Sequence, residues 1–292
     1  MYRAALSVDQ LTAIDLHVHI EVDEHGAASL PDDLLAAVSK YFKTSGVNPD
    51  LASVAEYYRA RKMAAVVFSV DAHTQLQHPP LSSRRIAEQA ADQADVLIPF
   101  GSVDPQRGQA AVDDAIDLVE NFGVRGFKLH PTVQGFDPSA DDVQPLWAAL
   151  ERLGVPVLIH TGQTGIGAGT PGGRGLRLRL SNPMLLDDVL AEHPRLQIVM
   201  AHPAVPWIDE QLSIATHKAN AWIDLSGWSP KYFPAQLVRA ANSYLQDKVM
   251  FGSDFPLLTP ERWMDDFAGL DIKDEVRSKI LKDNAVRLLQ LG

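Results

Sequence analysis

The strongest constraint on the fold is a regular alternation of short apolar runs with longer amphipathic segments along the whole chain. Continuous apolar runs of strand length are typical of strands that are buried on both faces, as in parallel sheets. Eight such runs occur, at 11–20, 64–70, 96–103, 124–130, 156–160, 196–202, 221–226 and 249–254. Helices are expected between and after them, at 32–43, 51–62, 82–93, 106–121, 141–153, 183–192, 207–218 and 234–244, and in pieces over 259–291.

Eight strands that alternate with helices predict an α/β fold of the (β/α)8 TIM-barrel type. No change of composition indicates a linker, so we expect residues 1–292 to form a single domain. The polar stretch 21–31 and the helix after it form a small insertion after the first strand, which we expect to cover the mouth of the barrel. An open doubly wound sheet is the alternative, but the first strand lacks the Gly-x-Gly-x-x-Gly turn of a dinucleotide-binding fold.

The amino-acid composition excludes several kinds of catalytic chemistry and argues against several kinds of binding partner. The chain of 292 residues has no cysteine, which excludes disulfides, thiolate metal sites and cysteine nucleophiles. The net charge of −11 and an isoelectric point near 5.3 argue against nucleic acid or an anionic membrane as the main partner. No apolar run approaches the length of a membrane span, and the first residues lack the apolar core of a signal peptide, so we expect a cytoplasmic protein.

The first predicted strand ends in Asp15-Leu16-His17-Val18-His19. Side chains two residues apart in an extended chain point to the same face, so His17 and His19 project together. Two neutral imidazoles side by side can each offer a ring nitrogen to a divalent metal. The motif is short, and a pair of ordinary polar residues at a strand end is the alternative.

Other predicted strands also end in residues that can bind a metal or a substrate. Function in a barrel gathers at the carboxyl ends of the strands. Besides the first histidine pair, these ends hold Lys128, His130, His160, His202 and Asp254. Each histidine alone is explained by an ordinary hydrogen bond at a strand end. Taken together with Asp254, they predict a shared metal site.

The segments around these residues resemble the motifs of the amidohydrolase superfamily, and most closely the amidohydrolase-related branch that also contains non-oxidative decarboxylases and lactone hydrolases. The matching segments are DLHVH at 15–19, FKLHP at 127–131, LIHTG at 158–162, MAHP at 200–203 and FGSDFP at 251–256. Each motif is short, and it is their order and spacing over the whole barrel that make the resemblance specific.

The resemblance implies one divalent ion, zinc in the first place and manganese as the alternative. The ligands that it implies are His17, His19, His160 and Asp254. It places His202 beside the metal, where it would orient a water or a substrate oxygen. Family members with two metals bridge them through a carboxylated lysine at about the position of Lys128, but this branch usually has one metal, so we expect Lys128 to be unmodified and to contact a substrate anion. His130 departs from the simplest pattern, and we expect it to contact substrate, with a structural role as the alternative.

Such a site would hydrolyse a carbonyl compound. A zinc ion with an open position lowers the pKa of bound water to about 7. Asp254 would accept the proton of that water and return it to the leaving group. The metal, together with His202 or Lys128, would stabilise the oxyanion. The alternative role for Asp254 is a helix N-cap.

Three further features bear on the substrate. The glycine-rich stretch 164–175 follows a predicted ligand strand and carries Arg174, with Arg177 and Arg179 close behind. Positive charge at the mouth of an acidic protein favours an anionic substrate, such as a carboxylate or the phosphates of coenzyme A, although solvated rim arginines are the alternative. Trp228 follows the seventh predicted strand and would form an aromatic wall, with ordinary packing as the alternative.

The segments 162–165, 171–174 and 224–230 resemble a subgroup that cleaves β-ketoacyl-CoA thioesters of aromatic acids. We therefore predict a metal-dependent hydrolase, and specifically a hydrolytic retro-Claisen cleavage of an aromatic β-ketoacyl-CoA such as a 4-hydroxyphenyl compound. The alternatives are a lactone hydrolase, a non-oxidative decarboxylase of an aromatic or unsaturated acid in which Asp254 protonates carbon, and a catalytically silent barrel. His17 favours hydrolysis, because the decarboxylases that the chain resembles often have Glu at this position. Barrels of this branch are often dimers or tetramers, but the sequence indicates no interface.

Overall fold

The structure, a computed structural model, describes residues 1–43 and 48–291. Its described part contains eight strands, and every pairing between them is parallel. The strands are β1 Ala13–His19, β2 Met63–Phe68, β3 Leu97–Pro99, β4 Phe127–Leu129, β5 Val157–His160, β6 Ile198–Ala201, β7 Ala221–Asp224 and β8 Val249–Met250.

Hydrogen bonds close these strands into a barrel. They form two runs, β1 to β3 and β4 to β8, in sequence order. A bridge between Gly101 and Phe127 joins β3 to β4, and a bridge between Val18 and Phe255 joins β1 to the segment after β8. The predicted (β/α)8 barrel is therefore confirmed.

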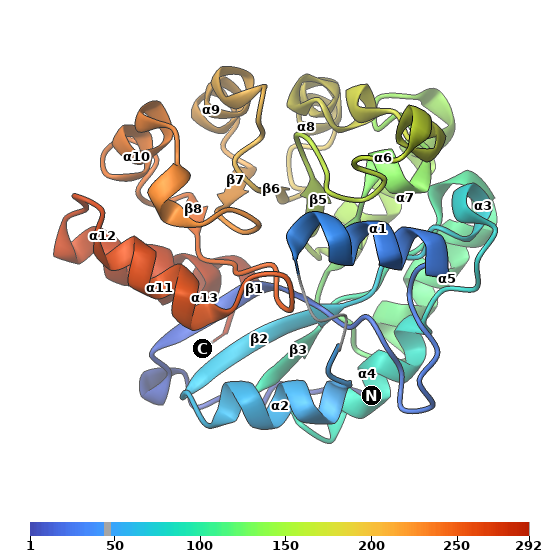
Figure 1. The fold of residues 1–292 in the computed structure, drawn as a ribbon, viewed down its shortest axis with the longest axis horizontal. Coiled ribbons are helices and arrows are strands. Elements are labelled where there is room, and N and C mark those ends of the chain that lie inside the picture. The colour runs from blue at the N-terminus through green and yellow to red at the C-terminus, as the bar shows by residue number, and fades with distance from the viewer. Residues whose placement is uncertain (44–47, 292) are drawn as a thin grey trace.

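Helices surround the barrel (Figure 1). The longer ones are α1 Asp32–Phe42, α2 Leu51–Arg59, α4 Ser83–Ala91, α5 Gln109–Glu120, α7 Gln144–Leu153, α8 Asp187–Glu192, α9 Ile208–His217, α10 Ala235–Ala241, α11 Pro260–Ala268, α12 Asp274–Ser278 and α13 Asn284–Leu289. Two four-residue helices, α3 His73–Leu76 and α6 Pro131–Gln134, are too short to produce a helical period in the sequence and were not predicted. The predicted helix 183–192 begins instead as a 3-10 turn, Pro183–Leu186, before α8.

Apolar side chains fill both the inside of the barrel and the space between its strands and helices. The inner cluster includes Ile14, Leu16 and Phe68 and is closed at one end by residues of α13. Val18 belongs to the outer cluster. The pairing register of β1 against β2 shifts between Asp15 and Val18, and shifts of this kind re-aim side chains near functional sites.

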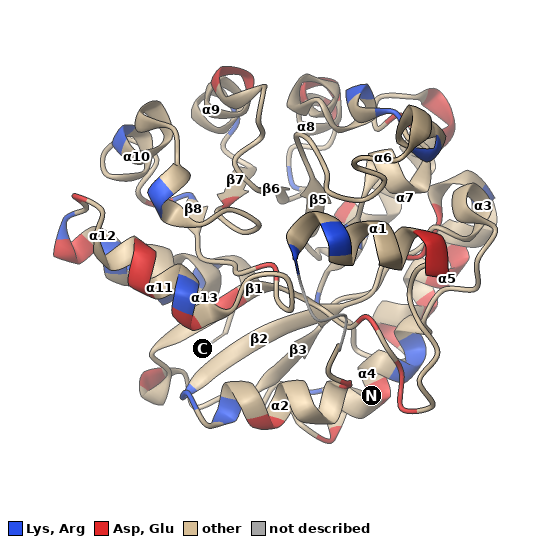
Figure 2. Cartoon of the chain, in the orientation of Figure 1, with Lys and Arg blue, Asp and Glu red and all other residues tan. Residues whose placement is uncertain are grey.

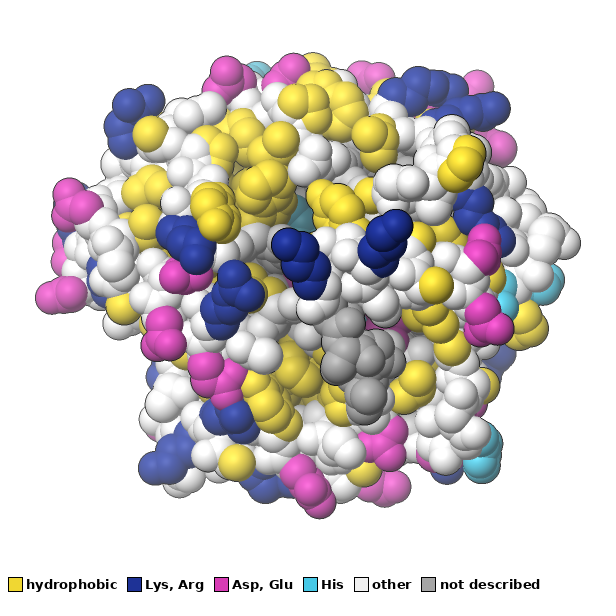
Figure 3. All heavy atoms as spheres, viewed as in Figure 1, with side chains coloured by type: hydrophobic (Ala, Val, Ile, Leu, Met, Phe, Trp, Pro, Cys, Tyr) yellow, Lys and Arg dark blue, Asp and Glu magenta, His cyan; other side chains and the backbone are white. Residues whose placement is uncertain are grey.

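Charged residues are concentrated on the outer helices and loops, while the strands are mostly uncharged (Figure 2). In the part of the chain that the structure describes, no helix is both long enough and apolar enough to cross a membrane. The space-filling view shows hydrophobic side chains around a hollow near the middle of one face, with a histidine side chain inside it (Figure 3).

Candidate active site

A cavity of about 250 Å³ opens at the carboxyl ends of the strands. Its polar lining at the strand ends comprises His19, Lys128, His130, His160, His202 and Asp254. Its apolar lining, from α1 and the surrounding loops, includes Leu35, Val38, Phe42, Ile166, Trp228 and Leu257. The insertion after β1 thus covers the mouth, as its sequence position predicts.

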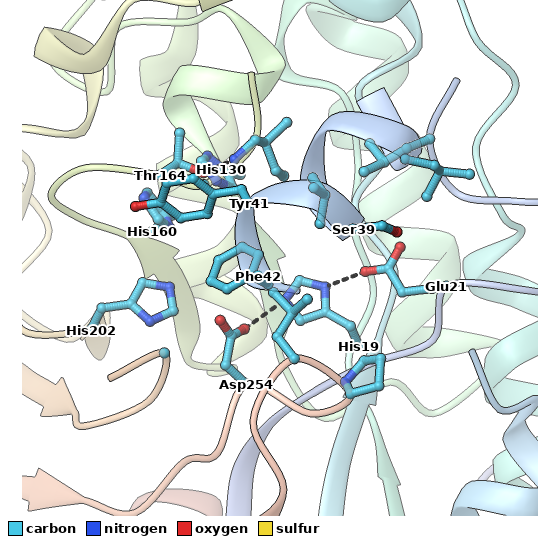
Figure 4. A pocket seen from close by; sticks show the side chains of 18 of the residues that line it. His19, Glu21, Ser39, Tyr41, Phe42, His130, His160, Thr164, His202 and Asp254 are labelled. Carbon is cyan, nitrogen blue, oxygen red and sulfur yellow. Dashed lines mark hydrogen bonds and ion pairs between the residues drawn. The ribbon is translucent and has the colours of Figure 1, made fainter. Parts of the chain in front are cut away.

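His17 and His19 of β1 meet Asp254, which follows β8, at the bottom of this cavity. The Nε2 atoms of His17 and His19 lie 3.2 Å apart, and each lies 3.2 Å from Oδ1 of Asp254. Figure 4 shows His19 and Asp254 turned toward each other. Ligand atoms bonded to one ion at about 2.1 Å lie about 3.0–3.4 Å from each other. The spacing of these atoms therefore fits a divalent metal.

The imidazoles of His202 and His160 lie next to this group of His17, His19 and Asp254. Ligand atoms of His17, His202 and Asp254 lie within 4.8 Å of one another. The Nε2 atom of His160 is buried and has no hydrogen-bond partner among the described residues, and its ring centroid lies 4.7 Å from that of His202. A buried polar atom without a partner is costly unless something else satisfies it, so this nitrogen also fits a metal ligand.

The protonation states of three of the imidazoles agree with metal binding, and that of His19 differs. Burial lowers the pKa of His17 and of His160 well below the ordinary value, and it lowers the pKa of His202 to about 4. These rings are therefore neutral at pH 7, which is the form that binds a metal. Burial also favours the neutral form of His19, but the carboxylates of Asp254 and Glu21 outweigh it and raise its pKa to about 9.

A second layer of side chains orients the histidine pair. Asp224, the last residue of β7, accepts a hydrogen bond from Nδ1 of His17 at 2.6 Å, and Glu21 lies 3.2 Å from Nδ1 of His19. A carboxylate on one ring nitrogen keeps the proton there and leaves the other nitrogen free for a metal. Neither acid was predicted as a site residue, although Asp224 ends a strand in the same way as the residues that were predicted.

A buried carboxylate also ties the first strand to the last. Asp15 accepts hydrogen bonds from the backbone N–H of His17 and of Ser253, and from the hydroxyls of Ser253 and Tyr58. Ser253 precedes Asp254, whose backbone N–H donates to the carbonyl of His17 at 3.0 Å. These bonds fix the distance between two implied ligands that lie at opposite ends of the chain.

Lys128 and His130 occupy the wall next to the histidines. Lys128 is fully buried, its Nζ lies 3.1 Å from Nε2 of His17, and burial lowers its pKa to about 8. Nδ1 of His130 accepts the backbone N–H of Val133 at the start of α6. The His130 ring stacks on that of His160, with centroids 3.8 Å apart.

The remaining predicted substrate residues are placed differently. Trp228 lines the cavity, whereas Arg174 and Arg177 do not. Arg174 forms a two-point ion pair with Asp33 of α1, at 2.6 and 3.1 Å, and Arg177 is exposed. The assignment of both arginines to substrate binding therefore stays a prediction that no contact with the cavity supports.

A closed parallel barrel with buried histidines and an aspartate at its carboxyl end has the residues of a candidate metal-binding active site. The amidohydrolase family model matches residues 14–291, so the chain belongs to the amidohydrolase family. In sequence it is 27% identical over 263 residues to a gamma-resorcylate decarboxylase from Rhodococcus jostii strain RHA1, covering 70% of this chain and 74% of that protein.

Solved structures agree on the fold. A TIM-barrel protein from Bordetella bronchiseptica, itself uncharacterised, matches with a TM-score of 0.76 and 23% identity, over 95% of this chain and 98% of that one. A 2,6-dihydroxybenzoate decarboxylase complexed with 2,6-dihydroxybenzoate matches with a TM-score of 0.70 and 18% identity, over 96% and 100%. A dihydroxybenzoic acid decarboxylase from Polaromonas, with bound manganese and 2-nitroresorcinol, matches with a TM-score of 0.66 and 16% identity, over 96% and 97%.

These comparisons correct the predicted reaction. The chain is an enzyme of the amidohydrolase superfamily, but the prediction of a hydrolase that cleaves aromatic β-ketoacyl-CoA compounds is wrong, because the named relatives are decarboxylases. A histidine at position 17 is compatible with either reaction. One ligand changes the charge of a metal site, but it does not determine which bond of the substrate is broken.

Proposed function

We propose that the protein is a metal-dependent, non-oxidative decarboxylase of a small hydroxylated aromatic carboxylic acid. The observation that carries this proposal is the similarity in sequence to gamma-resorcylate decarboxylases, which spans most of both chains. The cavity supports it, because apolar and aromatic walls suit a ring while the polar bottom suits a carboxylate and a hydroxyl group.

One divalent ion, zinc or manganese, would be held by His17, His19, His160 and Asp254. A bound ion supplies positive charge that binds and orients the oxygens of an anionic substrate. Lys128 lies on the cavity wall, where burial lowers the pKa of its amine to about 8. Among the described lining residues it is the one lysine or arginine. We propose that its ammonium group attracts the substrate carboxylate and that His130 and Trp228 contact the ring.

Asp254 would deliver the proton that replaces CO2. Its Oδ1 makes both contacts with the histidine pair, which leaves Oδ2 to relay a proton. Burial alone would raise the pKa of Asp254, but the hydrogen bond from His19 outweighs it and lowers that pKa, so the carboxylate takes a proton from water only during the reaction. Asp254 gives this proton to the ring carbon that bears the carboxylate, and an electron pair of the ring forms the new carbon–hydrogen bond. The carbon–carbon bond then breaks, its electron pair restores the aromatic ring, and CO2 leaves.

The test is a CO2-release assay on the purified protein, first stripped with a chelator and then reloaded with Zn²⁺ or Mn²⁺. The substrate panel contains 2,6-dihydroxybenzoate, 2,3-dihydroxybenzoate, 5-carboxyvanillate and unsubstituted benzoate. We expect CO2 and the matching phenol from at least one hydroxylated acid and none from benzoate. Asp254→Asn should abolish turnover, whereas the exposed control Asp9→Asn should not change it. A metal-loaded protein that releases no CO2 from any of these acids would contradict the proposal.

A further inference from the structure

Ser226 connects two of the site's imidazoles and plays no part in the proposal above. It lies just after β7 and is fully buried. Its hydroxyl oxygen is 2.9 Å from Nδ1 of His17, 2.9 Å from Nδ1 of His202 and 2.7 Å from Oδ2 of Asp224. Three polar atoms thus converge on one hydroxyl group that has a single hydrogen to donate.

The position of that hydrogen follows from the groups around it. Both oxygens of Asp224 act as acceptors, since Oδ1 accepts the backbone N–H of Ser226 at 2.9 Å and Oδ2 accepts Nδ1–H of His17. If the Ser226 hydroxyl gave its hydrogen to His202 instead, two oxygen atoms 2.7 Å apart would face each other without a proton. The hydroxyl therefore donates to Oδ2 of Asp224, which lies 2.7 Å away, nearer than Nδ1 of His202 at 2.9 Å. The Ser226 oxygen has no second hydrogen, so toward His202 it can only accept a hydrogen bond, from Nδ1–H.

The backbone confirms which nitrogen of His202 faces inward to the protein. A Cβ atom on Gly227 would lie 2.5 Å from Nδ1 of His202, so the chain closes tightly over this nitrogen. His202 itself has a left-handed backbone, with φ 69°, a conformation that costs energy and is found where a side chain must be aimed. Nδ1 is covered by Ser226 and Gly227, which leaves Nε2 as the nitrogen available to the cavity.

We infer that Ser226 is a positioning residue that holds the proton of His202 on Nδ1, so that Nε2 presents a lone pair to the substrate. His202 then accepts a hydrogen bond and cannot donate one from Nε2. In the cavity its partner is a ring hydroxyl of the substrate. A hydroxyl that donates to Nε2 gains electron density on its oxygen and passes it to the ring carbon that Asp254 protonates. This catalytic consequence rests on the proposed decarboxylase function, whereas the proton position does not.

The first experiment reads the proton position directly and needs no activity. Protein labelled with 15N-histidine, metal-free and at pH 7.5, gives separate resonances for protonated and unprotonated ring nitrogens. The His202 signals are those missing from a His202→Gln spectrum. We expect a protonated Nδ1 and an unprotonated Nε2 in the native protein. A proton on Nε2 would overturn the inference, whether or not the protein proves to be a decarboxylase.

The second experiment tests the role of the hydroxyl. Ser226→Ala should give a mixture of His202 tautomers in the same spectrum, while Ser213→Ala, which removes an exposed hydroxyl bonded within α9, should leave the spectrum native. If CO2 release is established, Ser226→Ala should lower kcat about 10- to 100-fold with KM changed less than about threefold, as expected when a proton-accepting group loses its orientation. A native His202 spectrum in Ser226→Ala would refute the role of Ser226.

Discussion

Nδ1 of His17 lies 2.6 Å from Oδ2 of Asp224, although the two residues are 207 positions apart in the chain. Both side chains are fully buried, so solvent does not screen this contact. It turns Nε2 of His17 toward His19 and Asp254. Asp224, which orients the ligand His17, therefore helps to determine whether this site can hold a metal.

Removing the charge of Asp224 should weaken metal binding. We expect Asp224→Asn to lower the affinity for Zn²⁺ or Mn²⁺ by about 10- to 100-fold, because the orienting carboxylate of His17 is lost. Competition with a chromophoric chelator measures this affinity. Asp188→Asn, a matched change at an exposed acid, should bind metal as the native protein does. Equal affinities for the two variants would contradict this prediction.

Metal affinity should rise with pH. In the metal-free protein, burial opposes a charge on His19, but Asp254 and Glu21 raise its pKa to about 9. A raised folded pKa contributes stability to the metal-free protein that is complete below the unfolded value of about 6.5 and is lost as pH rises through about 9. A metal must displace that proton, so we expect affinity to increase up to about tenfold per pH unit between about pH 7 and 8.5.

The competition assay at several pH values checks this dependence. Glu21→Gln supplies the control, because without one of its two carboxylate partners His19 should lose its proton at a lower pH and the rise in affinity should begin earlier. An affinity that does not change over the range would show that His19 carries no proton there.

A methyl group at Gly227 should damage the site. Its φ is 74°, and a Cβ would lie 2.5 Å from Nδ1 of His202 and 3.2 Å from Oδ2 of Asp254. Gly26 has a similar φ of 83° but has nothing within 4 Å of such a Cβ. Both alanine variants should lose about 1–2 kcal/mol for the left-handed backbone, measured by urea unfolding. We expect only Gly227→Ala to lose activity as well.

The two positively charged residues proposed or predicted for the substrate should behave differently. Arg174→Ala should change kcat/KM for the acid substrate by less than about threefold, because it breaks only a surface ion pair with Asp33. Lys128→Met, inside the cavity, should lower kcat/KM by about 10-fold or more. Steady-state kinetics on both variants shows which of the two residues binds substrate. A larger loss of kcat/KM for Arg174→Ala than for Lys128→Met would indicate that Arg174 contacts the substrate.

The alternation of apolar runs with amphipathic segments was sufficient to predict the barrel, since strands buried on both faces carry uninterrupted apolar runs. The rule that function lies at the carboxyl ends of strands selected His17, His19, His160, His202 and Asp254, and the structure brings these side chains together. Asp224 also ends a strand but was not predicted. The reaction was predicted wrongly, because hydrolysis and decarboxylation can use the same ligand set.

The sequence by itself determined the barrel, its insertion after the first strand and the residues at the strand ends, because these depend on local period and on position along each strand. Only the tertiary structure decided the contacts between distant strands: Asp15 with Ser253, Asp224 with His17, and Ser226 with His202. It also decided that Arg174 pairs with Asp33 outside the cavity. Contacts of this kind depend on barrel closure and on the direction of individual side chains, and neither leaves a periodic pattern in the sequence.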